Sequence, residues 1–202
     1  MMIYREAGYR AVPWKNGGGI TREIVRQPAT GERFDWRLSL ATIERRGPFS
    51  AFDGFERTLV LVRGAGVVLS FAGHGEARLS SPGQLTVFDG SWATHAVPVD
   101  GACIDLNLLV WRRSLEAQTR CVALREEQMV TSSAAGATVI CCVAGSVQIA
   151  SQSGECVQLQ AVDTAVCAPA DGALRCRPRL PHSTTIFVAC LTPRASGTTA
   201  GS

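Results

Sequence analysis

The segment Trp14-Lys15-Asn16-Gly17-Gly18-Gly19 brings together groups that could bind a small polar ligand. An indole, a cation and an amide precede three glycines, and Thr21 and Glu23 follow on an expected strand. Glycine has no side chain to bury, so such a run indicates a sharp turn or a close approach of backbone N–H groups to a ligand. It fits neither a phosphate loop, since no Gly-Lys-Ser/Thr closes it, nor a dinucleotide fingerprint. The segment predicts a ligand site; a mobile Gly-rich turn is the alternative.

A second polar group lies in the apolar run Ile104–Leu108. On a strand, successive side chains point to opposite faces, so Asp105 and Asn107 share one face. Burying a carboxylate and an amide without partners costs free energy. We therefore expect both to point into a pocket inside a small β-barrel, rather than to solvent from an edge strand.

Arginines on two further strands could hold carboxylates. Arg37 and Ser39 share a strand face with Asp35, and Arg57 follows a turn-rich loop that contains Ser50. An inward-facing arginine is a bidentate carboxylate receptor, whereas a surface ion pair within the sheet is an equally good interpretation of Arg37. We expect the aromatic residues of the loop to serve packing.

The sequence gives no sign of a metal centre or a catalytic nucleophile. The three histidines, His74, His95 and His182, form no His-x-His motif, and the eight cysteines form no Cys-x-x-Cys pair. Gly-x-Ser-x-Gly is absent, and no cysteine has a convincing partner base. We expect no metal, no cofactor and no catalytic residue.

Composition indicates an ordinary globular protein. Of 202 residues, 46% are hydrophobic and 18% charged, and the net charge of +3 argues against dedicated nucleic-acid binding. No apolar run reaches transmembrane length, and the start of the chain lacks the apolar core of a signal peptide. The cysteines are expected to be reduced and buried, so a cytoplasmic location is predicted.

Short apolar runs between turn residues predict an all-β fold, a sandwich or barrel. The expected strands span residues 36–43, 58–62, 67–71, 85–88, 104–110, 139–143, 157–159 and 186–191. One helix is expected over 114–128, with Ser114 as its cap. A faint repeat with an offset of roughly 80 residues predicts two modules, 1–112 and 113–194, followed by a disordered tail at 195–202. The first module carries the polar residues and therefore the site.

Four blocks in order resemble the HutD/Ves family: the Trp14–Gly19 motif with Thr21 and Glu23; Trp36-Arg37-Leu38-Ser39; Gly47-Pro48-Phe49-Ser50 with Phe52, Gly54 and Arg57; and Asp105-Leu106-Asn107. The resemblance covers the first half of the chain. It implies a bicupin, two β-barrel or jelly-roll modules in one chain, without the His-rich metal motif of catalytic cupins. It also implies an association with histidine utilisation and binding of formimino- or formylglutamate in a regulatory role, or, in the Ves branch, a link to stress or cold response.

The sequence therefore predicts a bicupin that binds a small anionic metabolite without a metal and acts as a sensor in histidine catabolism. The expected binding residues are Trp14, Lys15, Asn16, Gly17, Gly18, Thr21, Glu23, Arg37, Ser50, Arg57, Asp105 and Asn107. Lysine and arginine would hold carboxylates, and Asp105 and Asn107 the formimino or formyl end. Neither nucleic acid nor a membrane is expected as a partner, whereas a homodimer is possible. The alternative is a hydrolase or isomerase on the same ligand, with Glu23 or Asp105 as general base and Lys15 as electrophile.

Overall fold

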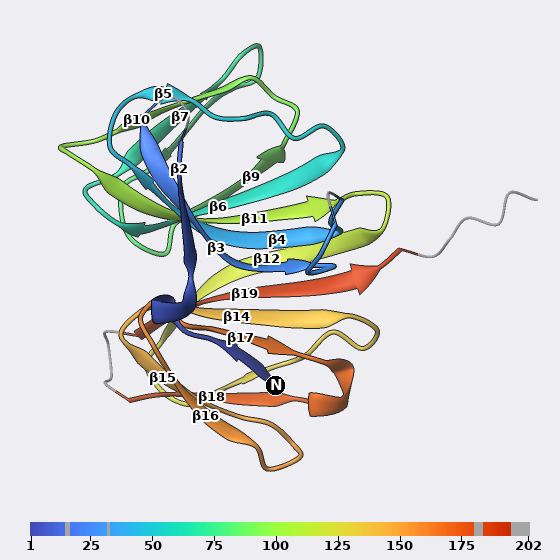
Figure 1. Ribbon diagram of the computed structural model, residues 1–202. Helices are drawn as coiled ribbons and strands as arrows, with labels where there is room; N and C mark the ends of the chain where they lie inside the picture. Colours follow the sequence, from blue (N-terminus) through green and yellow to red (C-terminus); the bar gives the residue numbers. More distant parts are fainter. Residues whose placement is uncertain (15–16, 32, 180–183, 195–202) are drawn as a thin grey trace, which may run out of the picture.

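The computed structural model describes residues 1–14, 17–31, 33–179 and 184–194, and this part of the chain is built from β-strands (Figure 1). The strands are β1 (Met2–Tyr4), β2 (Arg10–Pro13), β3 (Gly19–Gln27), β4 (Trp36–Ile43), β5 (Gly47–Pro48), β6 (Phe55–Arg63), β7 (Val67–Phe71), β8 (Gly75–Leu79), β9 (Leu85–Asp89), β10 (Thr94–Pro98), β11 (Cys103–Trp111), β12 (Leu115–Leu124), β13 (Gln128–Val130), β14 (Ala137–Ala144), β15 (Ser146–Ala150), β16 (Cys156–Gln160), β17 (Thr164–Cys167), β18 (Leu174–Pro178) and β19 (Thr184–Pro193). Two 3-10 turns, η1 (Glu6–Gly8) and η2 (Pro169–Asp171), are the helical elements of the described residues, none of which is long and apolar enough to cross a membrane.

The strands form four sheets stacked in layers (Figure 1). The outer four-stranded sheet, β5-β10-β7-β8, covers the six-stranded sheet β2-β3-β4-β11-β6-β9. The five-stranded sheet β1-β17-β14-β19-β12 lies on the other side of the six-stranded sheet, and β13-β18-β15-β16 forms the last layer. Each sheet is an open run of strands in the part of the chain described.

Three apolar clusters fill the spaces between the layers. The central cluster joins Leu38 and Leu106 of the six-stranded sheet to Phe187 of the five-stranded sheet. Because side chains alternate across a strand, the residues between these leucines face the other way, toward the β5-β10-β7-β8 layer. The polar residues of β4 and β11 thus lie on the face away from the central core.

The same strand order occurs twice in the described part of the chain. The run β4-β11-β6-β9 of the six-stranded sheet matches β12-β19-β14-β17 of the five-stranded sheet, with each strand number raised by eight. The outer sheets correspond in the same way, β5-β10-β7-β8 with β13-β18-β15-β16. The division between residues 112 and 113 stays a prediction, and the tail at 195–202 lies outside the described residues.

The predicted helix at 114–128 is wrong: most of this segment forms the strand β12, and Gln128 begins β13. Its ten residues pair antiparallel with β19 from Leu115 to Leu124, and their burial alternates over most of the strand. β-Branched residues such as Thr119 and Val122 suit a half-buried sheet surface better than a helix. The long tertiary pairing with β19 therefore overrides the weak local preference for a helix.

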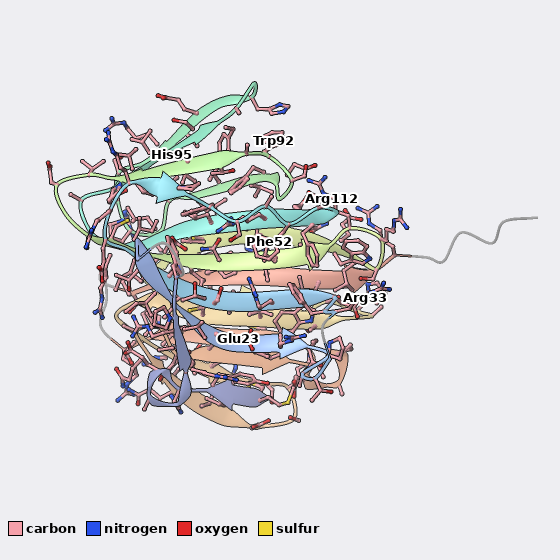
Figure 2. The ribbon with its side chains drawn as sticks, turned by 45° about the horizontal axis from the view of Figure 1, so that its top comes forward. Glu23, Arg33, Phe52, Trp92, His95 and Arg112 are labelled. Atoms are coloured by element: carbon pink, nitrogen blue, oxygen red, sulfur yellow. The ribbon has the colours of Figure 1, made fainter. Side chains whose placement is uncertain are left out.

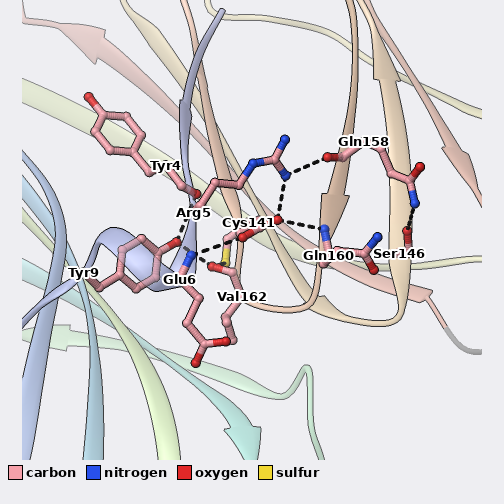
Figure 3. A network of polar contacts seen from close by, with 10 residues as sticks. Tyr4, Arg5, Glu6, Tyr9, Cys141, Ser146, Gln158, Gln160 and Val162 are labelled. Atoms are coloured by element: carbon pink, nitrogen blue, oxygen red, sulfur yellow. Dashed lines mark hydrogen bonds and ion pairs between the residues drawn. The ribbon is translucent and has the colours of Figure 1, made fainter.

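The N-terminal residues bridge the two halves of the chain (Figure 3). Strand β1 pairs with β17, and the Arg5 guanidinium lies 2.6 Å from the Asp163 carboxylate. Asp163 also accepts a hydrogen bond from the backbone N–H of Glu6, and Tyr9 Oη donates to the Val162 carbonyl at 2.7 Å. Strand β2, which follows directly, pairs instead with β3 in the six-stranded sheet. One short segment thus attaches to both central sheets.

Candidate functional site

A cavity of about 620 Å³ lies over the outward face of the six-stranded sheet. Its walls come from β2, β3, β4, β6 and β11 and from the segment that begins at β5. The lining residues are Val12, Pro13, Trp14, Thr21, Glu23, Arg37, Ser39, Ala41, Pro48, Phe49, Ser50, Phe52, Arg57, Asn107 and Leu109. Figure 2 labels two of them, Glu23 on β3 and Phe52 in the segment after β5.

Strand register arranges the polar side chains in rows across this face. Arg37 on β4 and Arg57 on β6 are both register partners of Leu109 on β11. Ser39 is likewise the partner of both Glu23 and Asn107 in the next row. The predicted sharing of one strand face by Arg37 and Ser39 is confirmed, because both line the cavity.

Arg57 is a buried cation that lines the cavity. Its Nε donates to Asn107 Oδ1 at 2.6 Å, and its guanidinium carbon lies 4.4 Å from the centre of the Phe49 ring. Burial lowers the pKa of Arg57 to about 10; the charge of Asp105 opposes this shift and that of Arg37 adds to it. The guanidinium is still charged at neutral pH, and it carries that charge with little water around it.

Arg37 is held between two aromatic rings. Its guanidinium carbon lies 5.1 Å from the ring centre of Phe34 and 5.2 Å from that of Phe52. Burial lowers the pKa of Arg37, and nearby Glu23 partly opposes that shift. Within the described residues, neither Arg37 nor Arg57 has a carboxylate oxygen within 4.0 Å, and Arg37 Nε has no hydrogen-bond partner. The two arginines of this cavity therefore have no anionic partner in contact with them among the described residues.

Asp105 lies beneath the cavity rather than on its surface. Its side chain has no exposure, and Oδ1 accepts a hydrogen bond from Asn107 Nδ2. That bond and the one from Arg57 form a chain, Asp105 to Asn107 to Arg57. Burial raises the pKa of Asp105 to about 7, and the Arg57 cation limits the rise. The shared face of Asp105 and Asn107 is confirmed, but only Asn107 reaches the cavity.

The glycine motif has a local structural explanation. Gly17 has a φ of 65°, and its N–H closes a turn on the Trp14 carbonyl at 3.0 Å. A Cβ built on Gly19 would overlap the Thr42 carbonyl oxygen, so close packing of strands excludes any side chain there. Trp14 Nε1 donates to Thr21 Oγ1 at 2.7 Å, which places the indole in the cavity wall. The interpretation of the glycine run as a turn or a ligand contact is thus incomplete, because close packing against β4 is what requires glycine at position 19.

Most of the predicted site residues that the structure describes come together in the cavity. Those on its surface are Trp14, Thr21, Glu23, Arg37, Ser50, Arg57 and Asn107. Gly17, Gly18 and Asp105 do not line it, and Lys15 and Asn16 lie outside the described residues. The ring contacts of Phe49 and Phe52 with the arginines were missed, since these aromatics were assigned to packing. Their position just before the Arg57 strand was the available signal.

A metal site needs several ligands in one place. Among the described residues, no group of three or more His, Cys, Asp or Glu side chains is placed to hold a metal ion. His95 is exposed on β10, and His74 stacks on Trp92 with ring centres 4.1 Å apart. The polar side chains that line the cavity are therefore those of arginine, asparagine, serine, threonine and one glutamate, together with the Trp14 indole.

Comparisons with known proteins place the chain in a family. The HutD family model matches residues 6–185. A 21.2 kDa uncharacterized protein from the hutC 3' region of Pseudomonas putida is 37% identical over 110 residues, 54% of this chain and 57% of that protein. Protein Ves of Citrobacter koseri is 35% identical over 108 residues, 53% and 56% of the two chains. The matched stretches thus span little more than half the length of these curated relatives.

Solved structures are similar over nearly the whole chain. HutD from Pseudomonas fluorescens SBW25 is 30% identical, with a TM-score of 0.81 over 96% of this chain and 99% of that one. A conserved protein of unknown function from Pseudomonas aeruginosa PAO1 gives 29% identity and 0.85 over 95% and 98%. Oxalate decarboxylase from Lactobacillus farciminis, at 8% identity and 0.69 over 97% and 87%, shares the cupin-like fold alone. The chain belongs to the HutD family.

Proposed function

We propose that this protein binds a small dicarboxylate of the formylglutamate or formiminoglutamate class in the cavity of the six-stranded sheet. The observation that carries the proposal is the pair Arg37 and Arg57, two poorly solvated cations that line one cavity without a carboxylate in contact among the described residues. Pairing with an anion offsets the free-energy cost of burying each guanidinium charge. The planar, forked N–H groups of arginine match the two oxygens of a carboxylate. A bound dicarboxylate would supply the carboxylate contacts that the described residues do not give these two arginines.

The polar groups suggest how such a ligand lies. Its carboxylates face Arg37 and Arg57, and its acylated nitrogen faces Ser39, Asn107 and Glu23 in the neighbouring row. Glu23 could accept hydrogen bonds from a formimino group, which is cationic when protonated, and Ser39 from a formamide N–H. The sequence predicts a direct contact of Asp105 with the acylated end of the ligand. In this arrangement Asp105 acts indirectly, through its hydrogen bond with Asn107. The rings of Phe52 and Phe49 pack against the guanidinium groups of Arg37 and Arg57, respectively.

We further propose that the two halves are two cupin modules, of which the first binds the ligand and the second supports it. The doubled strand order supports this division. HutD family membership links the chain to histidine utilisation, and the proposed role there is that of a metal-independent cytoplasmic sensor. The effect on the pathway would come from the ligand-bound protein, as a monomer or a homodimer, contacting a partner other than nucleic acid or membrane.

Calorimetry with defined probes tests the proposal. N-formylglutamate, N-formiminoglutamate, glutarate and formate are titrated into the wild-type protein, and the acylated dicarboxylates should bind more tightly than glutarate or formate. Failure of all four to bind contradicts the proposal. The same samples test the enzyme alternative, in which Glu23 of the cavity wall is the general base. Release of formate from N-formylglutamate, monitored by NMR and abolished by Glu23→Gln, would identify a hydrolase instead.

A further inference from the structure

Asp105 carries a buried carboxyl group of which only one oxygen accepts a hydrogen bond from the described residues. Oδ1 accepts from Asn107, whereas Oδ2 has no hydrogen-bond partner in the part of the chain that the structure describes. The side chain has no exposure to solvent. An ionised carboxylate in such a place is costly unless a cation compensates it.

Arg57 on β6 is the cation that favours the ionised form of Asp105. On β4, the register partner of Asp105 is Ala41, and the ionisable residue of that strand in the cavity is Arg37. Glu23 on β3 and the Cys103 thiol on β11 add no positive charge, and burial, with a smaller contribution from the charge of Asp105, raises the pKa of Cys103. The covering strands β7 and β10 contribute buried apolar side chains, Val67, Leu69, Phe71 and Ala96, with His95 exposed on the outside of β10.

Arg57 therefore faces two anions when a ligand is present. Beneath the cavity it compensates Asp105 through the Asn107 amide, and on the surface it lines the space where a carboxylate would bind. Its single charge cannot fully compensate both in a poorly solvated site. Since the ligand carboxylates are weak bases, Asp105 is the group able to give up its charge, by taking a proton from solvent on its free Oδ2. The hydrogen bond from Asn107 to Oδ1 is retained in that form.

We propose that the cavity binds its anionic ligand together with one proton, and that Asp105 is the proton acceptor. The inference rests on the proposed function, because it needs an anion in the cavity. Asp105 is then a positioning and charge-regulating residue, with no contact to the ligand. In its neutral form it leaves the charge of Arg57 to the ligand, and in its ionised form it competes with the ligand for that charge.

The consequence is a defined dependence of affinity on pH. Burial raises the pKa of free Asp105 to about 7, and the bound anion raises it further. Below that value Asp105 is already protonated, so affinity changes little with pH. Above it, binding requires proton uptake, and the dissociation constant rises by up to about tenfold per pH unit until the pKa of the bound form is reached. A cavity without this linkage would have a flat profile, since Arg37 and Arg57 stay charged throughout.

Calorimetry of the wild-type protein with N-formylglutamate measures the proton directly. Titrations at pH 7.5 in HEPES and in Tris, which differ in ionisation enthalpy, should show uptake of up to one proton per ligand. Repeating them from pH 6 to 8 should show weaker binding as the pH rises. Binding with no proton uptake and a flat profile overturns the inference and leaves the proposed function standing. Absence of binding overturns both.

Two variants assign the proton to its residue. Asp105→Asn keeps the shape and cannot titrate, so it should bind without proton uptake and with a flat profile. If proton uptake and the pH dependence of affinity persist in this variant, the assignment to Asp105 is overturned. Glu23→Gln, which removes the carboxylate on the cavity surface, should retain proton uptake whatever its affinity. If Asp105→Asn does not fold, carbon-13 NMR of the wild-type Asp105 carboxyl decides: its titration midpoint should rise on saturation with N-formylglutamate, and an unchanged midpoint contradicts the inference.

Discussion

Arg37 and Arg57 flank Leu109, each as its register partner on the neighbouring strand. Strands lie about 4.8 Å apart, so the two arginine backbones are roughly 10 Å apart on one face of the sheet. Arg37 contributes to lowering the pKa of Arg57, which means that the two charges repel each other across the cavity. An anion between them relieves that repulsion, and the sheet fixes the spacing at which it must bind.

Replacement of either arginine by alanine should weaken N-formylglutamate and glutarate to a similar extent. Each arginine offers the ligand a charge-assisted hydrogen bond worth about 1.5–3 kcal/mol, or roughly 10- to 150-fold in affinity. Lysine at either position should recover part of the loss, because it keeps the charge and loses the planar fork. Calorimetry on the folded variants gives these values.

Arg63 provides the matched control for this series. It lies at the end of β6, the strand that carries Arg57, and it is exposed outside the cavity. Arg63→Ala should leave affinity for both ligands unchanged. A loss as large as that of Arg57→Ala would show that long-range charge, rather than contact in the cavity, governs binding.

Gly19→Ala and Gly17→Ala should differ sharply in stability although they lie two residues apart. A Cβ at position 19 overlaps the Thr42 carbonyl oxygen, whereas the space around Gly17 is open and the cost is its φ of 65°. We expect a loss of about 1–2 kcal/mol for Gly17→Ala and clearly more for Gly19→Ala, because backbone must move. Urea denaturation measures both; equal losses would mean that β3 shifts away from β4 at little cost.

Asp105→Asn should be more stable than the wild type at pH 8. There Asp105 is ionised and buried, whereas asparagine bears no charge. As the pH falls below about 7, folded Asp105 binds a proton, while the unfolded chain stays ionised down to about pH 3.9. The wild type therefore gains up to about 1.4 kcal/mol per pH unit relative to the variant over this range. Denaturation at pH 5 and 8 tests it, and a pH-independent difference would contradict the raised pKa.

Asp163→Ala should destabilise the protein more than Arg5→Ala. The Asp163 carboxylate accepts from Arg5 and from the backbone N–H groups of Glu6 and Gln160, and its side chain is 7% exposed against 48% for Arg5. We expect a loss of about 2 kcal/mol for Asp163→Ala and less than about 1 kcal/mol for Arg5→Ala. A double-mutant cycle in urea isolates the ion pair. The reverse order would mean that the Arg5 bond to the Gln158 carbonyl dominates.

Cys141→Ala and Cys142→Ala should reduce stability and spare ligand binding. The two thiols are fully buried on opposite faces of β14, in the central cluster and in the cluster beneath it, away from the cavity. Each loss of packing should cost about 1–2 kcal/mol. Affinity for N-formylglutamate, measured alongside urea denaturation, should be unchanged; a folded variant that no longer binds would place the site elsewhere.

The sequence alone determined most of the strands and the face on which each of their side chains lies. Period-two alternation is a property of the extended backbone, so the spacing of Arg37 with Ser39, and of Asp105 with Asn107, assigns each pair to a common face. The repeat was also visible, because equivalent strands need similar apolar patterns. The resemblance carried by the Trp14–Gly19 block and its companions identified the family.

Only the tertiary structure decided how deeply each side chain is buried and which distant residues it contacts. Alternation says which face a residue occupies, but not how far the covering layer extends over it, so Asp105 is sealed beneath the cavity while Asn107, two residues along, lines it. The strand β12 exists because β19, a segment distant in the sequence, pairs with it over its full length, and no local pattern encodes that contact. The packing of Phe49 on Arg57 likewise depends on a loop folding back over the sheet. Such features depend on contacts between segments that are distant in the sequence, and local periodicity carries no information about the energies of those contacts.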